Sequence, residues 1–160
     1  MTTDRWLVIG VFLLYILFSA HSPILSLRCP SNCIRHPRNG HSYCLTPEGL
    51  SWPEAEAFAR LKGGHLVTIN DAAEQVWLVK TFGGDRWMWM GFTDVDREGK
   101  WRWVSGRLVT FTNWHWGEPN NSHSGEHYAC MNWGNPGEWN DLGPSSLEWF
   151  QVGIGIIEIP

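Results

Sequence analysis

The clearest helical pattern in the chain begins after Ser51. Ser51 and Glu54 match a capping box, Pro53 lies in the first turn, and Gly63-Gly64 ends the pattern. Between these signals apolar side chains recur at intervals of three and four residues, which predicts a helix with one buried face. The predicted face consists of Trp52, Ala55, Phe58, Ala59 and Lys62.

A second helix is predicted after Asp71, which forms a capping pair with Glu74, and it ends at Gly83-Gly84. Its predicted face carries Val76, Trp77 and Lys80. The other apolar stretches are short and favour strands. Two helices followed by a strand-rich half predict an α+β domain. The predicted strands cover residues 41–45, 65–69, 87–92, 101–104, 108–111, 128–133 and 152–158.

The first residues have the pattern of a targeting segment. Asp4-Arg5 precede an uncharged run from Trp6 to Ala20, which is about as long as the apolar core of a signal peptide. The uncharged run continues to Leu27 and is then barely long enough to cross a membrane. We therefore interpret residues 1–28 as a signal peptide or a membrane anchor.

Residues 29–40 are rich in Pro, Arg and Asn without periodicity, so we expect a linker there and one domain over residues 41–160. The chain has four cysteines, which allow three fully paired connectivities, and the sequence does not choose among them. Cys33 with Cys44 could close an N-terminal hairpin. Cys130 lies in an apolar run, where a buried free thiol is the simpler interpretation.

Five side chains with oxygen ligands gather in the Trp-rich second half of the chain. Carboxylates and amide carbonyls without a thiol suit a hard cation that takes about six to eight oxygens, which indicates calcium rather than zinc or copper. Magnesium fits less well because it keeps most of its waters. Since such a site needs extracellular calcium, we favour leader cleavage and secretion over a membrane-anchored form. The five residues are Glu118, Asn120, Glu126, Asn140 and Asp141.

Several function classes are not favoured. The net charge is -4 and no Lys/Arg cluster follows one face, which argues against nucleic-acid binding. Residues 123–127 match the His-x-x-Glu-His pattern of one class of zinc protease, but their polar, Gly-containing context does not favour the helix that this chemistry needs. Glu118 and Glu126 make poor glycosidase acids if they bind a metal. We therefore predict a binding protein rather than an enzyme.

Twelve tryptophans are many for one small domain. Six of them come in three pairs two residues apart, which fits strands with one face against a core, so we interpret most of these as structural. Trp116 is the exception, because it lies next to the oxygen set and could contact a ligand. Trp139 is expected to orient Asn140 and Asp141.

Taken in order and spacing, these motifs resemble a C-type lectin-like domain from His41 to Ile159. The resemblance implies an α+β fold with two helices, small antiparallel sheets and a long calcium-binding loop region. The matching residues are Ser51–Phe58, Gly63–Ile69, Trp89–Phe92, Asn113-Trp114, Glu118-Pro119-Asn120, Glu126 and Trp139–Asp141.

In that family the residues matching the five oxygen ligands bind the principal calcium ion, and the matching proline follows a cis bond, which is plausible for Pro119. A sugar then binds the ion through two neighbouring hydroxyls. The Glu-Pro-Asn triplet resembles that of mannose-type members, which implies mannose, N-acetylglucosamine or fucose as ligands. The implied carbohydrate-binding residues are Glu118, Asn120, Glu126, Asn140 and the apolar Leu142.

The resemblance also has departures. The family's second calcium site matches Asp94, Glu98 and Asn121, but its last acidic position is His127 here, which implies a weak or empty auxiliary site. A family cysteine pair is replaced by Ala59 and Ile157. The chain therefore resembles the disulfide-poor members of the family.

These observations predict a secreted, calcium-dependent lectin whose partners are glycans. Single-site lectins bind weakly and gain avidity from multivalency, so a homo-oligomer is a further expected partner state. The alternative is a protein- or surface-recognition module on the same fold, in which calcium only orders the loops.

Overall fold

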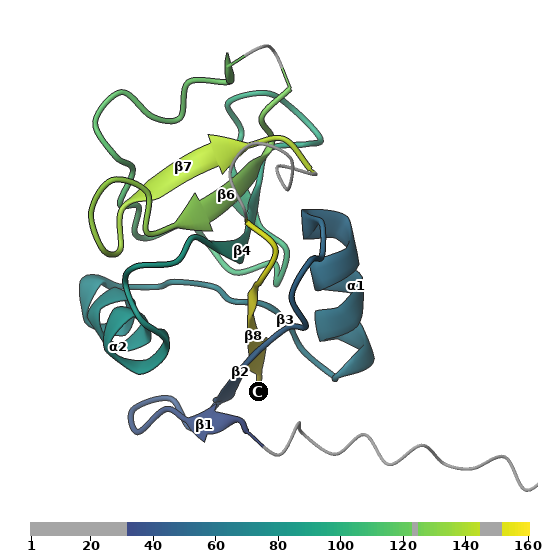
Figure 1. Ribbon diagram of the computed structural model, residues 1–160, viewed down its shortest axis with the longest axis vertical. Coiled ribbons are helices and arrows are strands. Elements are labelled where there is room, and N and C mark those ends of the chain that lie inside the picture. Colours follow the sequence, from purple (N-terminus) through teal and green to yellow (C-terminus); the bar gives the residue numbers. More distant parts are fainter. Residues whose placement is uncertain (1–31, 123–124, 145–151) are drawn as a thin grey trace, which may run out of the picture.

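The computed structural model describes residues 32–122, 125–144 and 152–160. Two helices and two four-stranded antiparallel sheets confirm the predicted α+β fold (Figure 1). The sheets have the strand orders β1-β2-β8-β3 and β5-β4-β6-β7. The elements are β1 (Ile34–Arg35), β2 (Ser42–Leu45), α1 (Trp52–Leu61), β3 (His65–Leu66), α2 (Ala72–Phe82), β4 (Met88–Thr93), β5 (Arg102–Trp103), β6 (Tyr128–Met131), β7 (Trp139–Leu142) and β8 (Ile156–Ile159).

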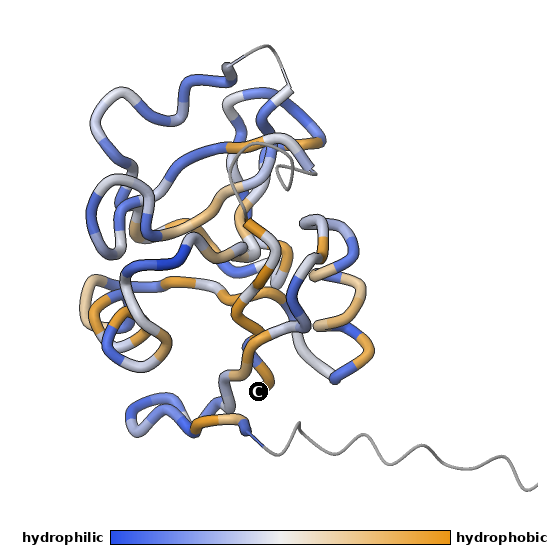
Figure 2. Tube along the Cα trace, in the orientation of Figure 1, coloured by the Kyte–Doolittle hydropathy of each residue, from blue (hydrophilic) through white to orange (hydrophobic). Residues whose placement is uncertain are grey.

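The two helices lie on either side of the β2–β8 strand pair, and the second sheet lies above that pair in Figure 1. Apolar positions follow β8 and recur along both helices, whereas the loops at the top of the view are mainly hydrophilic (Figure 2). The leader predicted over residues 1–28 lies outside the described residues. Among those that are described, no helix is long and apolar enough to cross a bilayer.

The tryptophans predicted to be structural form much of the core. Phe92 lies at the centre of one cluster, with its ring centroid 4.3 Å from that of Trp103 and 5.6 Å from that of Trp139. A second cluster contains Trp89 and Trp52, whose indole Nε1 donates a hydrogen bond of 2.7 Å to the Met90 carbonyl. Together these aromatic side chains fix the sheet that carries the polar loops.

The helix ends follow the sequence signals, but the buried faces differ in part. Ser51 N donates to Glu54 Oε2 at 2.9 Å, and Asp71 Oδ1 accepts from Glu74 N at 2.8 Å. In α2 the predicted face is wrong for Val76, which is 51% exposed, whereas Leu78 is fully buried. In α1 a carboxylate is buried instead of only apolar groups, because Glu56 accepts hydrogen bonds from His65 Nδ1 and Leu66 N.

The strands are shorter than predicted and one expected strand is missing. Residues 108–111 form no strand and Leu108 is 83% exposed, because no neighbouring strand pairs with this stretch. Conversely, β7 is a strand that was not predicted, and it forms where a calcium-binding loop was expected. It pairs with β6, with Asn140 opposite Cys130 and Asp141 opposite Ala129.

The prediction of a linker over residues 29–40 is wrong for the second half of that range. Ile34 and Arg35 pair with Tyr43 and Ser42, and a Cys33–Cys44 disulfide closes this hairpin. Residues 33–40 therefore belong to the folded domain. The remaining expectation for cysteine is confirmed, since Cys130 is a buried free thiol.

Candidate functional site

The five predicted oxygen ligands come together from three segments. Asn140 and Asp141 lie on β7 and are 3% and 1% exposed. Glu118 and Asn120 flank Pro119, and the Glu118–Pro119 bond is cis, as expected. Glu126 lies two residues before β6 and joins the group through hydrogen bonds within the loop.

Asp141 connects the strand to the loop. Its Oδ1 accepts a hydrogen bond of 3.0 Å from Asn120 N, and its Oδ2 accepts one of 2.7 Å from Asn121 N. Asn121 has a positive φ of 46°, a conformation that few residues other than Gly and Asn adopt readily. A buried carboxylate therefore holds two consecutive backbone amides of the loop over the end of the sheet.

Ser122 organises the other side of the loop. Its backbone N donates to Asn120 Oδ1 and to Glu126 Oε2, both at 2.8 Å. Glu126 N in turn donates to Asn121 Oδ1 at 3.1 Å. These bonds draw two of the predicted ligands together through the backbone, so the loop is already ordered around the site.

Two oxygens of the set have no such partner. Glu118 Oε2 and Asn140 Oδ1 are buried, and neither accepts a hydrogen bond from any residue that the structure describes. A buried acceptor without a partner costs about 1–3 kcal/mol, so native proteins rarely leave one unsatisfied. Both atoms belong to the predicted ligand set, and a bound cation would satisfy them.

The electrostatics of the site point the same way. Burial, together with the charge of Asp141 and a hydrogen bond to it, raises the pKa of Glu118 to about 7, and the charge of Glu126 adds to the effect. Burial also raises the pKa of Glu126. Carboxylates that repel one another in a partly dry site favour either protons or a cation between them. The residues present therefore fit a calcium ion, which prefers carboxylate and amide oxygens.

The predicted auxiliary residues form a second cluster beside the first. Ligand atoms of Asp94, Glu98 and His127 all lie within 4.8 Å of one another. His127 Nδ1 is 3.0 Å from Asp94 Oδ1 and 3.6 Å from Glu98 Oε2. Asn121 Nδ2 donates to Glu98 Oε2 at 2.6 Å, so all four named residues are in contact. The imidazole hydrogen-bonds with Asp94 and lies beside Glu98, the two carboxylates that a calcium ion would need there.

Trp116 lies at the tip of a tight turn next to the site and is 93% exposed. Glu118 N donates to the His115 carbonyl at 3.0 Å, which closes the turn, and Gly117 takes a positive φ of 93°. His115 Nδ1 pairs with Glu138 Oε2 at 2.6 Å, and this contact lowers the pKa of Glu138. The turn therefore holds the indole in solvent two residues before a predicted ligand.

One predicted contact is wrong. Leu142, expected to contact a sugar ring, is only 1% exposed and packs in the second core cluster with Leu66 and Trp89. It is buried because it is paired with Tyr128 of β6 and packs among the apolar residues of that cluster. His123 of the zinc-protease pattern lies outside the described residues, and the segment from Gly125 to His127 is not helical.

Sequence reasoning also missed two contributors. Ser122 was not predicted to matter, although its amide joins two ligands, and no side-chain pattern indicates a backbone donor. The strand position of Asn140 and Asp141 was missed as well. The apolar residues that bracket them, Trp139 and Leu142, are the signal that could have indicated a buried strand.

Comparison with known proteins gives a consistent result. Residues 48–148 match the family described as "Lectin C-type domain". The chain is 32% identical over 143 residues to a perlucin-like protein of Mytilus galloprovincialis, covering 84% of this chain and 88% of that protein. It is 41% identical over 116 residues to the human "C-type lectin domain family 17, member A", covering 72% of this chain but only 29% of the human protein.

Solved structures show the same fold. The cow carbohydrate-recognition domain of CD23, determined in the presence of a GlcNAc2Man3 oligosaccharide, aligns with a TM-score of 0.70 and 26% identity, over 82% of this chain and 95% of that one. Herring type II antifreeze protein aligns with a TM-score of 0.71 at 22% identity, over 82% and 98% of the two chains. At that identity the likeness concerns the fold alone.

Proposed function

The chain belongs to the C-type lectin domain family, a family of non-enzymatic binding modules, and from that premise we propose that it binds sugars through a calcium ion. The proposed ion ligands are Glu118, Asn120, Glu126, Asn140 and Asp141. The observation that carries the proposal is the pair of buried oxygens without partners, Glu118 Oε2 and Asn140 Oδ1, within a group of mutually repelling carboxylates.

The proposed ligand is a mannose-type sugar with two neighbouring equatorial hydroxyls. A bound calcium ion would supply the coordination positions for those hydroxyls. The carboxylates of Glu118 and Glu126 would accept hydrogen bonds from them, while the amides of Asn120 and Asn140 would donate. The Glu-Pro-Asn order supports this assignment, because exchanging acid and amide would exchange acceptor and donor.

We expect little calcium at the auxiliary cluster. His127 already contacts both Asp94 and Glu98, and a nitrogen ligand suits calcium poorly. The proposal is therefore one principal ion. A calcium titration should fit a single binding site, over the same calcium concentrations at which the melting temperature of the protein rises.

Trp116 is proposed to contact a second sugar unit of a longer glycan. Its exposure and its position on a turn that ends at Glu118 support this role. Changing Trp116 to Ala should leave calcium affinity and binding of a monosaccharide unchanged but weaken binding of an oligomannoside roughly fivefold, or about 1 kcal/mol. Equal affinity of both proteins for the oligomannoside would remove the proposed contact.

The experiment that tests the function is retention on immobilised mannose and galactose, first with calcium and then with a chelator. We expect retention on mannose that the chelator releases, and passage through galactose. A matched variant, Asp141→Ala, should lose retention, because it removes an ion ligand and the acceptor for two loop amides.

The alternative function is recognition of a protein or another surface. It would be favoured if neither column retained the protein while calcium still raised its melting temperature.

The location and the oligomeric state are also proposals. We propose a secreted protein, alternatively a membrane-anchored one, that gains avidity from self-association. Because the chain spans less than a third of the human relative, that relative's further segments give no guide here.

A further inference from the structure

The cluster beside the proposed calcium site combines one imidazole with two carboxylates. Asp94 directly follows β4, Glu98 lies in the turn after it, and His127 directly precedes β6. A ligand atom of each side chain lies within 4.8 Å of the other two. Two segments that are far apart in the sequence therefore bring three metal-binding groups to one point.

The spacing of these groups suits one small metal ion. Zinc bonds to nitrogen and oxygen are about 2.0–2.2 Å long, so neighbouring ligand atoms of a tetrahedral site lie about 3.3–3.6 Å apart. His127 Nδ1 is 3.0 Å from Asp94 Oδ1 and 3.6 Å from Glu98 Oε2. Small side-chain rotations would therefore be enough to admit an ion between the three groups.

The donor types favour a transition metal over calcium. The position of His127 is acidic in the family's second calcium site, and calcium prefers ligands that are all oxygen. An imidazole nitrogen is instead a preferred ligand of zinc and of the neighbouring transition metals. The change that makes the cluster a poor calcium site therefore makes it a better zinc site.

The backbone of His127 is fixed from two sides. Its carbonyl accepts hydrogen bonds from Asp94 N at 3.3 Å and from Thr93 Oγ1 at 2.6 Å. Its N donates to the Leu142 carbonyl at 3.1 Å. The imidazole is therefore held against the end of β4, and a metal ion would not have to order it.

The carboxylates are also oriented from outside the group. Gly99 N donates to Asp94 Oδ2 at 2.7 Å, which leaves Oδ1 facing the imidazole. Asn121 Nδ2 donates to Glu98 Oε2 at 2.6 Å. Such contacts behind the ligands are typical of metal sites, where they fix ligand orientation.

The buried charge of Asp94 needs a positive partner. Its side chain is fully buried, and in the part of the chain that the structure describes no Lys or Arg forms an ion pair with Asp94 or Glu98. A buried carboxylate is costly without a positive charge beside it. Either a protonated His127 or a metal ion shared by the three groups can supply that charge. Glu98 is 55% exposed, so an ion can enter from solvent on its side.

We propose that Asp94, Glu98 and His127 bind a transition-metal ion of the zinc type, with water at the remaining position. The ion joins the turn after β4 to the segment before β6. Since Glu126 precedes His127, the ion also fixes the backbone next to a proposed calcium ligand. The zinc site does not require the principal calcium ion, so it stands or falls separately from the proposed sugar binding.

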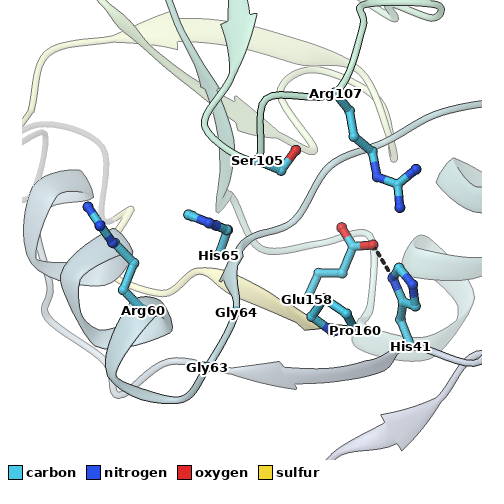
Figure 3. A pocket seen from close by; sticks show the side chains of 9 residues that line it. All are labelled: His41, Arg60, Gly63, Gly64, His65, Ser105, Arg107, Glu158 and Pro160. Carbon is cyan, nitrogen blue, oxygen red and sulfur yellow. Dashed lines mark hydrogen bonds and ion pairs between the residues drawn. The ribbon is translucent and has the colours of Figure 1, made fainter.

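Other histidines of the chain provide a matched control. Figure 3 shows two of them at a separate cavity, where His41 contacts Glu158 and His65 lies apart from both. His65 Nδ1 is 2.7 Å from Glu56 Oε1, so this histidine also pairs with a carboxylate. Neither histidine belongs to a group of three ligand side chains among the described residues. His65 therefore tests whether an imidazole–carboxylate pair is enough.

The test is a calorimetric titration of the full chain with zinc chloride in excess calcium, which occupies sites made of oxygen ligands. We expect one zinc ion per chain and a higher melting temperature. His127→Asp and Glu98→Gln should each weaken zinc binding at least about tenfold, whereas His65→Gln should not. His127→Asp should also bind one more calcium ion per chain than the parent, because all of its donors at the cluster are oxygens.

The variants are first compared with the parent by thermal unfolding in chelator. Glu98 lies on an exposed turn, so Glu98→Gln keeps the test decisive even if His127→Asp fails to fold. X-ray absorption of the zinc-loaded protein should show one imidazole among oxygen ligands. The proposal is overturned if zinc does not bind, if Glu98→Gln keeps the parent's zinc affinity, or if His65→Gln loses as much affinity as the cluster variants.

Discussion

Replacing Glu118 by Gln should change the stability of the protein in opposite directions with and without calcium. Gln keeps the shape and one oxygen of Glu118 but removes its charge. In chelator this removes the cost of burying the charge and relieves the repulsion from Asp141 and Glu126, which together raise the pKa of Glu118 to about 7. With calcium, the same change removes a charged ligand of the ion.

The magnitude follows from the pKa of Glu118. The usual value is 4.5, and each pKa unit corresponds to about 1.4 kcal/mol of difference between the protonation states. Because the group is only half-buried, solvent screening reduces this sum, and we expect about 1 kcal/mol. Since the folded-state pKa is above the unfolded one, the destabilisation of the native protein is absent below about pH 4.5 and complete above about pH 7.

The assay is thermal unfolding of the parent protein and the variant, followed by circular dichroism at neutral pH. In chelator the variant should melt about 4 °C higher. In calcium it should gain less than the parent, because tenfold weaker binding removes about 1.4 kcal/mol of ion-linked stability. Glu48→Gln, an exposed position paired with Arg86, is the control and should change neither result. A variant that melts lower than the parent in chelator would refute the reasoning.

Three further predictions concern protons, packing and the hairpin. Calcium affinity, measured by tryptophan fluorescence, should be roughly tenfold weaker at about pH 6 than at about pH 8, because the ion must displace the proton of Glu118; a flat profile would contradict this. Gly64→Ala should cost about 2–3 kcal/mol in urea unfolding, since its Cβ would lie 2.1 Å from the Glu158 carbonyl oxygen, and an unchanged midpoint would disprove that contact. Cys33→Ser should lower the free energy of unfolding by about 3 kcal/mol, because it opens a loop closed over 11 residues. Adding a reductant to the parent protein should lower it by the same amount, and no loss in either experiment would contradict the disulfide.

Local signals in the sequence were sufficient for the helices. The caps at Ser51 and Asp71 involve residues within four positions, so their hydrogen bonds could be predicted without knowing the fold. The burial of the faces could not, because it depends on distant elements. Trp77 packs on Tyr43, which lies on β2, and Val76 is consequently turned to solvent.

The candidate site divides in the same way. The residue types and their order predicted that these carboxylates and amides form one group, because a set of oxygen donors is visible in the sequence itself; their binding of calcium stays a prediction. The burial of Leu142 and the strand under Asn140 and Asp141 depend on pairing with β6, which is about ten residues away and has no polar signature. The role of the Ser122 amide depends on backbone conformation alone.

The disulfide-closed hairpin at the start of the domain has a mechanical consequence. β1 lies at the lower end of the molecule in Figure 1, and the loop before β6 lies at the upper end. Any tether joined before residue 32 would therefore attach at the end opposite the proposed calcium site. Tension along that tether would pass through the Cys33–Cys44 bond into β2 and its partner β8, and the loops of the proposed calcium site would not bear the load.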